Sequence, residues 1–322
     1  MLPSLRCVTN RSRQRALSTS LTTTVHIPTW LTENAASFSP PVMNKLLHRN
    51  QLSIMFVGGP NQREDFHMEE GSEFFYQLRG DMTLPPVQAG KRVDVNIREG
   101  DVYLLPSRIP HSPQRPQAGS LGLVIERQRY KEESPDGLRY YCDFATCDRV
   151  LWERYFHCND LGKDLVPVVQ AFNASVEKRT RIPTATSVPN DPPLEQDVDT
   201  IVPPPFQLNT WLEANSASLK EGNLLDLFPG HPDGEFKVRV AGGASEQREQ
   251  WQHETWLYQL RGTARVAVSS IDEAMTLNEG SCFVVPPDVA YKVQRSQGSL
   301  GLVVTNDPTG NKQHRFLHEH SQ

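Results

Sequence analysis

The chain has 322 residues, of which 22% are charged, and its formal net charge at pH 7 is −5. This length can hold two domains of ordinary size, each with its own core. The net negative charge does not favour a nucleic-acid-binding surface, and no apolar run approaches the length of about 18 residues that spans a bilayer. We therefore expect neither nucleic acid nor a membrane as a partner.

Two features bear on where the protein resides. Residues 1–25 contain four arginines, many serines and threonines, and no acidic residue. This composition is typical of a mitochondrial transit peptide, and it also fits a disordered extension. The five cysteines are odd in number and form no Cys-X-X-Cys pair, which favours reduced thiols in an intracellular protein. We expect a cytoplasmic protein, with mitochondrial targeting by residues 1–25 as the alternative.

One plan occurs twice along the chain. The segment Glu73–Gly80 returns as Thr255–Gly262, a shift of 182 positions (255 − 73), and Ser120–Val124 returns as Ser299–Val303. Copy one contains three residues that could bind a metal, and copy two has other residues in their places. The pairs are His67 and Glu249, Glu73 and Thr255, and His111 and Tyr291. One working half and one structural half are therefore expected.

Strand patterns dominate both copies. Val93, Val95 and Ile97 alternate with polar residues, the period of a strand with one buried face, and Val266 and Val268 repeat this alternation in copy two. Further short strands are predicted at residues 53–57, 102–105, 121–125 and 282–285. Such a series predicts an antiparallel sandwich or barrel.

The middle of the chain separates the copies. Asp160 is expected to cap a helix that runs through Leu165 to Phe172, with Pro167 as its weak point. Residues 181–204 are rich in proline, threonine and aspartate, which predicts a stiff linker. We therefore place a first domain at residues 26–180 and a second at residues 205–322.

The candidate metal ligands have the spacing of cupin-type barrels, which this sequence resembles. Six residues separate Glu73 from Gly80, and Gly100 is followed by a proline and then by His111 at the intervals of the second cupin motif. Many cupins have a further histidine at the position of Glu69, so the predicted ligand set is His67, Glu73 and His111.

Two imidazoles and one carboxylate predict a particular chemistry. They leave about three positions open in an octahedron, which suits non-haem Fe(II) that binds an organic substrate and O2. A single histidine is usually a surface or hydrogen-bonded residue. Three candidate ligands in register, all replaced together in copy two, favour the metal site.

Charged residues flank the predicted ligands. Arg63 lies four residues before His67 and Arg115 four residues after His111, so on extended strands both arginines should face the metal cavity. Glu126 follows an apolar strand. Inward guanidinium groups are costly unless an anion joins them, and they bind carboxylates with two hydrogen bonds. The cavity is therefore expected to bind an acidic organic substrate.

Internal Arg–Glu pairs are the alternative reading of these charges. In copy two, Ser245 replaces Arg63 and Thr305 replaces Glu126, whereas Arg295 is retained opposite Arg115. This comparison favours a functional role for Arg63 and Glu126, and a partly structural role for Arg115.

Several segments resemble the 3-hydroxyanthranilate 3,4-dioxygenase family, in its fused two-cupin form. They are Pro40–Lys45, Gly58–His67, Glu73–Leu78, Leu104–Arg115 and Gly137–Tyr141, and the likeness runs from about residue 29 to about residue 307. The resemblance implies an all-β bicupin, two jelly-roll barrels with a few short helices, in which the second barrel is degenerate and holds no metal.

The resemblance also implies an activity and site roles. The family opens the ring of 3-hydroxyanthranilate with O2, and the product, 2-amino-3-carboxymuconate semialdehyde, cyclises to quinolinate, a precursor of NAD in the kynurenine pathway. By resemblance, Fe(II) is bound by His67, Glu73 and His111. Arg63 lies by the O2 and substrate site, while Arg115 and Glu126 contact the substrate and Asn44 closes over it.

Two other functions are alternatives to this interpretation: another cupin enzyme and a storage protein. Another cupin enzyme, such as a different ring-cleaving dioxygenase or a metal-dependent isomerase, would share the ligands but need a different cavity. A two-cupin storage protein usually lacks ligands in both halves, whereas one set is intact here. Because fusion makes the pairing of two barrels intramolecular, we expect a monomer.

Overall fold

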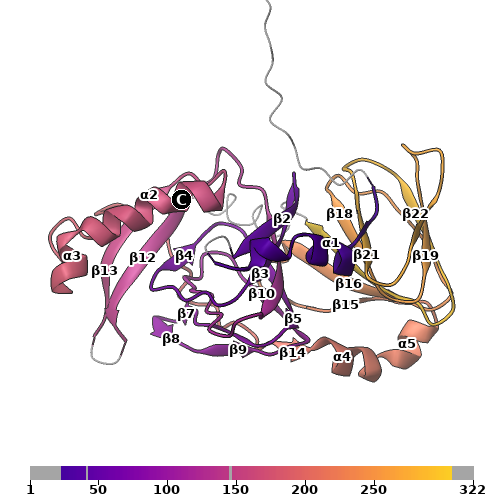
Figure 1. Ribbon diagram of the computed structural model, residues 1–322, viewed down its shortest axis with the longest axis horizontal. Coiled ribbons are helices and arrows are strands. Elements are labelled where there is room, and N and C mark those ends of the chain that lie inside the picture. Colours follow the sequence, from indigo (N-terminus) through magenta and orange to yellow (C-terminus); the bar gives the residue numbers. More distant parts are fainter. Residues whose placement is uncertain (1–22, 41–42, 145–146, 307–322) are drawn as a thin grey trace, which may run out of the picture.

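The computed structural model describes residues 23–40, 43–144 and 147–306. Most of its elements are strands, and these form two antiparallel halves that lie side by side (Figure 1). This arrangement confirms the predicted all-β, two-barrel fold with a few short helices. No helix in the described ranges is long and apolar enough to cross a membrane. Most of the amino-terminal extension, residues 1–22, lies outside the described residues.

The first half is built on a six-stranded sheet with the order β14-β10-β5-β11-β3-β2. A sheet of order β13-β12-β4 and two small ladders, β6-β9 and β7-β8, complete this half. The strand bounds are β2 Asn44–Arg49, β3 Leu52–Gly58, β4 Phe66–Met68, β5 Glu73–Arg79, β6 Met82–Leu84, β7 Val87–Gln88, β8 Lys91–Arg92, β9 Val95–Ile97, β10 Asp101–Leu105, β11 Leu121–Arg127, β12 Asp136–Asp143 and β13 Cys147–Phe156.

The second half repeats this plan with two sheets. Their orders are β1-β21-β18-β23-β16-β15 and β17-β22-β19-β20. The pairing of β18 with β21 and β23 matches that of β5 with β10 and β11, as the sequence repeat requires. The bounds are β15 Leu224–Asp226, β16 Phe236–Gly242, β17 Glu246–Glu249, β18 Thr255–Arg261, β19 Ala264–Val268, β20 Met275–Leu277, β21 Ser281–Val285, β22 Tyr291–Arg295 and β23 Leu300–Asn306.

Each half donates a short strand to the other. Strand β1, Val25–His26, pairs with β21 of the second half, and strand β14, Phe206–Gln207, pairs with β10 of the first half. Val25, which was assigned to the amino-terminal extension, is therefore part of a sheet. Both strands lead into matching helices: α1 Ile27–Glu33 and the 3-10 helix η1 Ala35–Phe38 in the first half, and α4 Leu208–Ala214 and α5 Ser216–Lys220 in the second.

The predicted helix after Asp160 is present as α2, Leu161–Ala174, followed by α3, Val176–Thr180. Asp160 is the N-cap residue, but its side chain makes no capping hydrogen bond. The carboxylate of Asp164 instead accepts hydrogen bonds from the backbone N–H groups of Asn159 and Asp160, both at 2.7 Å. Phe172 of α2 stacks on the ring of Tyr140 in β12, which anchors the helix to the first half.

Residues 181–204, predicted as a linker, pack against the first half. Leu194 is buried, Gln196 donates a hydrogen bond to the carbonyl of Val87 at 3.0 Å, and the backbone of Asp197 donates to that of Arg108 at 2.9 Å. This proline-rich segment is therefore attached to the first half along its length. Its assignment as the boundary between two domains stays a prediction.

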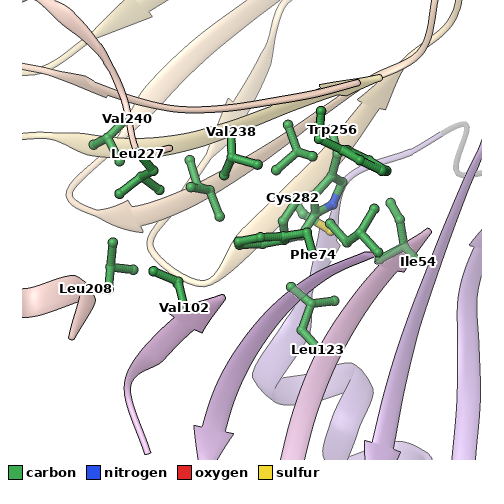
Figure 2. Close-up of a cluster of buried hydrophobic side chains, with 14 of the residues drawn as sticks. Ile54, Phe74, Val102, Leu123, Leu208, Leu227, Val238, Val240, Trp256 and Cys282 are labelled. Atoms are coloured by element: carbon green, nitrogen blue, oxygen red, sulfur yellow. The ribbon is translucent and has the colours of Figure 1, made fainter. Parts of the chain in front are cut away.

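One apolar core spans both halves (Figure 2). Phe74 and Ile54 of the first half and Trp256 and Val238 of the second are fully buried in this cluster. Burial of side chains of this size stabilises a fold by roughly 1.5–3 kcal/mol each. Because both halves contribute to the same cluster, separating them would expose apolar faces on each side.

Most predicted strands are present close to their expected positions. Residues 53–57, 102–105, 121–125 and 282–285 lie within β3, β10, β11 and β21. The alternation at Val93, Val95 and Ile97 predicted a longer strand than the one observed. Only Val95–Ile97 forms β9, and Val93 is 39% exposed, because the chain turns away after the short ladder β7-β8. The four described cysteines are free thiols.

Candidate metal centre

The three predicted metal ligands converge in the first half. His67 is in β4, Glu73 begins β5, and His111 follows β10. Backbone hydrogen bonds join His67 and His111 in both directions, at 2.8 and 2.9 Å, and Glu73 pairs with Leu105 near the end of β10. All three side chains are buried, and their ligand atoms lie within 4.8 Å of one another. The geometry therefore brings together a group that could hold a metal ion.

Both imidazoles have outer partners of the kind that orient metal ligands. Nε2 of His67 lies 2.8 Å from Oδ2 of Asp136, and Nδ1 of His111 lies 3.0 Å from the carbonyl oxygen of Ile109. A metal-bound histidine ordinarily donates its other ring N–H to such a carboxylate or carbonyl. One nitrogen of each ring is left for a metal. The donor set thus fits a divalent ion that accepts nitrogen and oxygen ligands.

Glu73 and His111 form a buried pair in which each side chain shifts the pKa of the other. Nε2 of His111 lies 2.7 Å from Oε1 of Glu73. Burial alone would raise the pKa of Glu73 and lower that of His111. The charge and hydrogen bond that each offers the other reverse both shifts, so the pKa of Glu73 falls to about 2 and the pKa of His111 rises above its ordinary value. Glu73 is therefore ionised, as a metal ligand must be.

A half-buried arginine near the ligands joins three buried carboxylates. Arg129 contacts Glu126 at 2.6 Å, Glu69 at 2.9 Å and Asp136 at 3.0 Å. Burial alone would lower the pKa of Arg129, but these carboxylates raise it well above its ordinary value. Glu69, Glu73 and Glu126 also place carboxylate oxygens within 4.8 Å of one another. Arg129 thus offsets repulsion among the acids that surround Glu73.

Two of these residues were missed by sequence reasoning. Asp136 precedes Gly137, a pair that reads as a turn, and Arg129 lies in a run of charged residues that reads as solvent-exposed. In the structure Asp136 begins β12, whose pairing with β4 sets Leu138 opposite His67. The sequence feature that could have identified Asp136 is the strand that follows it. Pairing of this strand with β4 brings the Asp136 carboxylate to the imidazole of His67.

Arg63 is one of the two predicted site arginines, and its part in the site stays a prediction. It precedes β4 rather than extending it, so the argument from even strand spacing does not apply. Its guanidinium binds Asp65, and its backbone exchanges hydrogen bonds with the Gln114 side chain at 3.0 and 2.8 Å. Burial lowers the pKa of Arg63, whereas Asp65, Tyr140 and Glu73 raise it above its ordinary value. The positive charge of Arg63 therefore interacts electrostatically with the carboxylate of Glu73.

Glu126 and Asn44 occupy different surroundings. Glu126 is buried in β11, where its neighbour Ile125 pairs with Phe74, so its carboxylate lies beside Glu73. Asn44 begins β2 and its side chain is exposed. The structure thus brings Glu126 to the candidate ligands and leaves Asn44 at the surface.

Arg115 is buried but lies away from the ligands. A Cβ added to Gly122 would come within 2.5 Å of its Nη2, and Gly122 pairs with Gln77 of β5. Gln77 lies four residues after Glu73 in β5, and Gly122 lies four residues before Glu126 in β11. Each interval corresponds to about 13 Å along a strand. The chain around Arg115 forms only isolated bridges, so the argument from even strand spacing does not apply to it. Burial lowers the pKa of Arg115 to about 10.

The second half places an arginine in the same surroundings. A Cβ on Gly301 would collide with the guanidinium of Arg295, which donates a hydrogen bond to Gln259 at 2.9 Å, and burial lowers its pKa to about 10. Within the described ranges, Nε of both arginines lacks a hydrogen-bond partner. This shared arrangement favours the partly structural role of Arg115, and its contact with a substrate stays a prediction.

A carboxylate network stands in the second half where the first has its candidate ligands. Glu249, at the position of His67, accepts two hydrogen bonds from Arg239 at 3.0 and 3.1 Å, one from Trp251 at 2.8 Å and one from Tyr291 at 2.7 Å. Burial alone would raise the pKa of Glu249, but these donors and the charge of Arg239 hold it below its ordinary value. Tyr291, at the position of His111, thus binds a carboxylate.

Comparisons with known proteins show the family to which the chain belongs. The family model described as 3-hydroxyanthranilic acid dioxygenase matches residues 19–173 and 201–322. The rat and human proteins named 3-hydroxyanthranilate 3,4-dioxygenase are 43% and 42% identical, over 89% and 88% of this chain and 98% and 96% of their own. Among solved structures, a cupin 2 conserved barrel domain protein from Leptotrichia buccalis has a TM-score of 0.49 and 9% identity, over 89% of this chain and 98% of its own. The chain therefore belongs to the 3-hydroxyanthranilic acid dioxygenase family.

Proposed function

We propose that this chain cleaves the aromatic ring of 3-hydroxyanthranilate with O2 in an extradiol-type reaction. The product would be 2-amino-3-carboxymuconate semialdehyde, which leads to quinolinate and NAD through the kynurenine pathway. The observation that carries this proposal is the buried group of His67, Glu73 and His111 in a chain whose relatives are named for this reaction. Another cupin enzyme would share the ligand set, and the family membership favours this substrate.

We propose Fe(II) as the metal at this group. Two imidazoles and one carboxylate are the donor set of non-haem iron oxygenases, and the Asp136 and Ile109 contacts hold both rings for coordination. When bound, iron supplies a Lewis acid with open positions for both substrate and O2. Glu73, ionised by its surroundings, provides the one anionic ligand.

The residues around the ligands would bind and orient the substrate. The positive charge of Arg63 interacts electrostatically with Glu73, so Arg63 would pair with the substrate carboxylate or stabilise negative charge that develops on oxygen. Glu126 could accept a proton from the hydroxyl or amino group. The Arg115 guanidinium, which lacks a charged partner among the described residues, would need to swing toward Glu126 to contact the substrate. Asn44 would close over the bound ring.

We also propose that the protein is a cytoplasmic monomer. The shared core and the exchanged strands β1 and β14 satisfy the pairing of barrels within one chain. Mitochondrial targeting by residues 1–25 is the alternative location. Size-exclusion chromatography with light scattering tests the first point, and a stable dimer would contradict it.

The experiment that tests the activity uses protein purified without oxygen and loaded with Fe(II). On addition of 3-hydroxyanthranilate in oxygenated buffer, O2 uptake and the absorbance of the muconate semialdehyde should rise together in equal amounts. His67→Ala should abolish both. If iron is bound and no O2 is consumed, the substrate assignment is wrong, and other aromatic acids would be tested next.

A further inference from the structure

Two buried acids of the second half reach into the first half beside the candidate metal centre. Asp233 and Glu235 precede β16 and are each 5% exposed. Oδ2 of Asp233 accepts a hydrogen bond from the Ser72 hydroxyl at 2.7 Å and another from the Ser107 backbone N–H at 2.5 Å. A single carboxylate oxygen thus joins the residue before β5 to the segment that follows β10.

Glu235 uses both of its oxygens. Oε2 accepts a hydrogen bond from the backbone N–H of Ser72 at 2.7 Å, and Oε1 accepts one from Nε of Arg127. Arg127 is 1% exposed, and its two terminal nitrogens bind the carboxylate of Glu133 at 2.7 and 2.6 Å. The Glu235 carboxylate therefore fixes the start of β5 relative to the end of β11.

The residues that bind Asp233 and Glu235 are close in sequence to residues of the candidate metal centre. Ser72 directly precedes Glu73, and Arg127 directly follows Glu126. Ser107 lies four residues before His111, in the turn that leads from β10 to that ligand, and the next residue, Arg108, donates a backbone hydrogen bond to Glu69 at 2.7 Å. Three segments that carry the metal centre are thus tied to one short stretch of the second half.

We propose that Asp233 and Glu235 are positioning residues for the metal centre, supplied by the second half, whose described residues contain no group of candidate ligands. The inference rests on the metal site of the proposed function and adds residues to it. Coordination tolerates displacements of only a few tenths of an ångström. Buried carboxylates that accept backbone N–H groups restrict such displacements at Glu73 and on the approach to His111.

The opposite contact between the halves supplies a matched control. Glu254 occupies the position of Ser72 in copy two (72 + 182) and is 3% exposed. It accepts hydrogen bonds from the Asn50 side chain at 2.7 Å and the Leu52 backbone at 2.8 Å, and it contacts His48 at 3.0 Å. These partners lie in and between β2 and β3, which carry none of the three ligands. Loss of Glu254 should loosen the contact between the halves without moving the metal ligands.

The test measures the Fe(II) affinity of the full chain under argon, by competition with a chromogenic chelator and without substrate. Asp233→Ala and Glu235→Gln should each weaken iron binding by about tenfold or more, the range seen when outer partners of ligands are removed. Glu254→Ala should bind iron as wild type does. Asp233→Asn should restore affinity, because one amide oxygen can accept both hydrogen bonds that Oδ2 accepts now.

Two results would overturn the proposal. One is wild-type affinity in both Asp233→Ala and Glu235→Gln, and the other is an equal loss in Glu254→Ala. Thermal melts would confirm that each variant is folded at the assay temperature. If Asp233→Ala does not fold, Glu235→Gln, which keeps the size of the side chain, decides the question. Because iron affinity is measured without turnover, a failure to cleave 3-hydroxyanthranilate would refute the proposed function and leave this test intact.

Discussion

The carboxylate network of the second half gives a sharp stability prediction. Glutamine in place of Glu249 keeps the shape of the side chain but removes its charge and turns one acceptor into a donor. Four hydrogen bonds now end on Glu249, two from Arg239 and one each from Trp251 and Tyr291. In Glu249→Gln at least one of these donors must face an amide N–H, and Arg239 loses its charged partner.

The size of the effect follows from burial. Removing one partner of a buried ion pair costs about 3–5 kcal/mol, because the other charge is left without compensation. The side chains of Arg239 and Glu249 are 14% and 19% exposed, so the lower end of this range applies, about 3 kcal/mol. An unfolding entropy of about 2.1 cal/mol/K per residue corresponds to about 1.5 °C per kcal/mol for 322 residues, so the melting temperature should fall by about 4–5 °C.

Thermal and urea unfolding followed by circular dichroism measure this change. Arg239→Met and the double variant with Glu249→Gln complete a double-mutant cycle. The loss of unfolding free energy in the double variant should be smaller than the sum of the two single losses by at least about 1 kcal/mol. Because the pKa of Glu249 lies below its ordinary 4.5, the contribution is present above that pH and is lost as pH falls through the folded pKa. Glu249→Gln should remove this dependence. A change in melting temperature under about 2 °C, or strict additivity, would refute the reasoning.

Three further predictions concern the first half. His67→Ala should leave a folded protein that retains no stoichiometric iron after desalting, as measured by plasma emission; full retention would contradict the ligand assignment. Arg63→Met should lower kcat/KM for 3-hydroxyanthranilate by about 100-fold in the O2-uptake assay. Unchanged turnover and substrate affinity would exclude the role given to Arg63. Arg129→Met leaves three buried carboxylates without their common cation, so urea unfolding should show a loss of about 3–5 kcal/mol, and a loss under about 1 kcal/mol would show that the acids are compensated elsewhere.

The repeat made the architecture predictable. A shift of 182 positions matched strands in both halves, and β5 and β18 do occupy equivalent places in their sheets. Short apolar runs closed by glycine or proline located β3, β10 and β21, and an apolar run located β11, because these strands are mostly buried. Periodicity failed at Val93, since a short alternating run has the same pattern in a turn as in a strand. The exchange of β1 and β14 could not be read from sequence, because two-residue strands have no period.

The candidate site was predictable where sequence spacing sets geometry. His67, Glu73 and His111 were found because motif spacing fixes their places in a barrel. Arg63 and Arg115 were both assigned by counting along extended chain, which neither segment maintains. A parity argument applies only within a continuous ladder, so the roles given to both arginines stay predictions.

The residues that surround the ligands were beyond such reasoning. Asp136 reaches the site through the pairing of β12 with β4, and Arg129 lies in the segment between β11 and β12. Asp233 and Glu235 come from more than 100 residues away in sequence. Contacts of this kind depend on tertiary packing, which a single sequence does not encode as a local pattern.

The two halves differ in the contacts on which each depends. In the second half, the positions that match the candidate ligands include Glu249, whose hydrogen bonds link β17, β16 and β22. The first half depends on the second for a shared core, for strand β14 and for the carboxylates at Ser72 and Arg127. A carboxylate network in one copy is therefore compatible with contacts that support the candidate metal centre of the other. This asymmetry is how a duplicated barrel with one group of candidate ligands among its described residues would still require both of its halves.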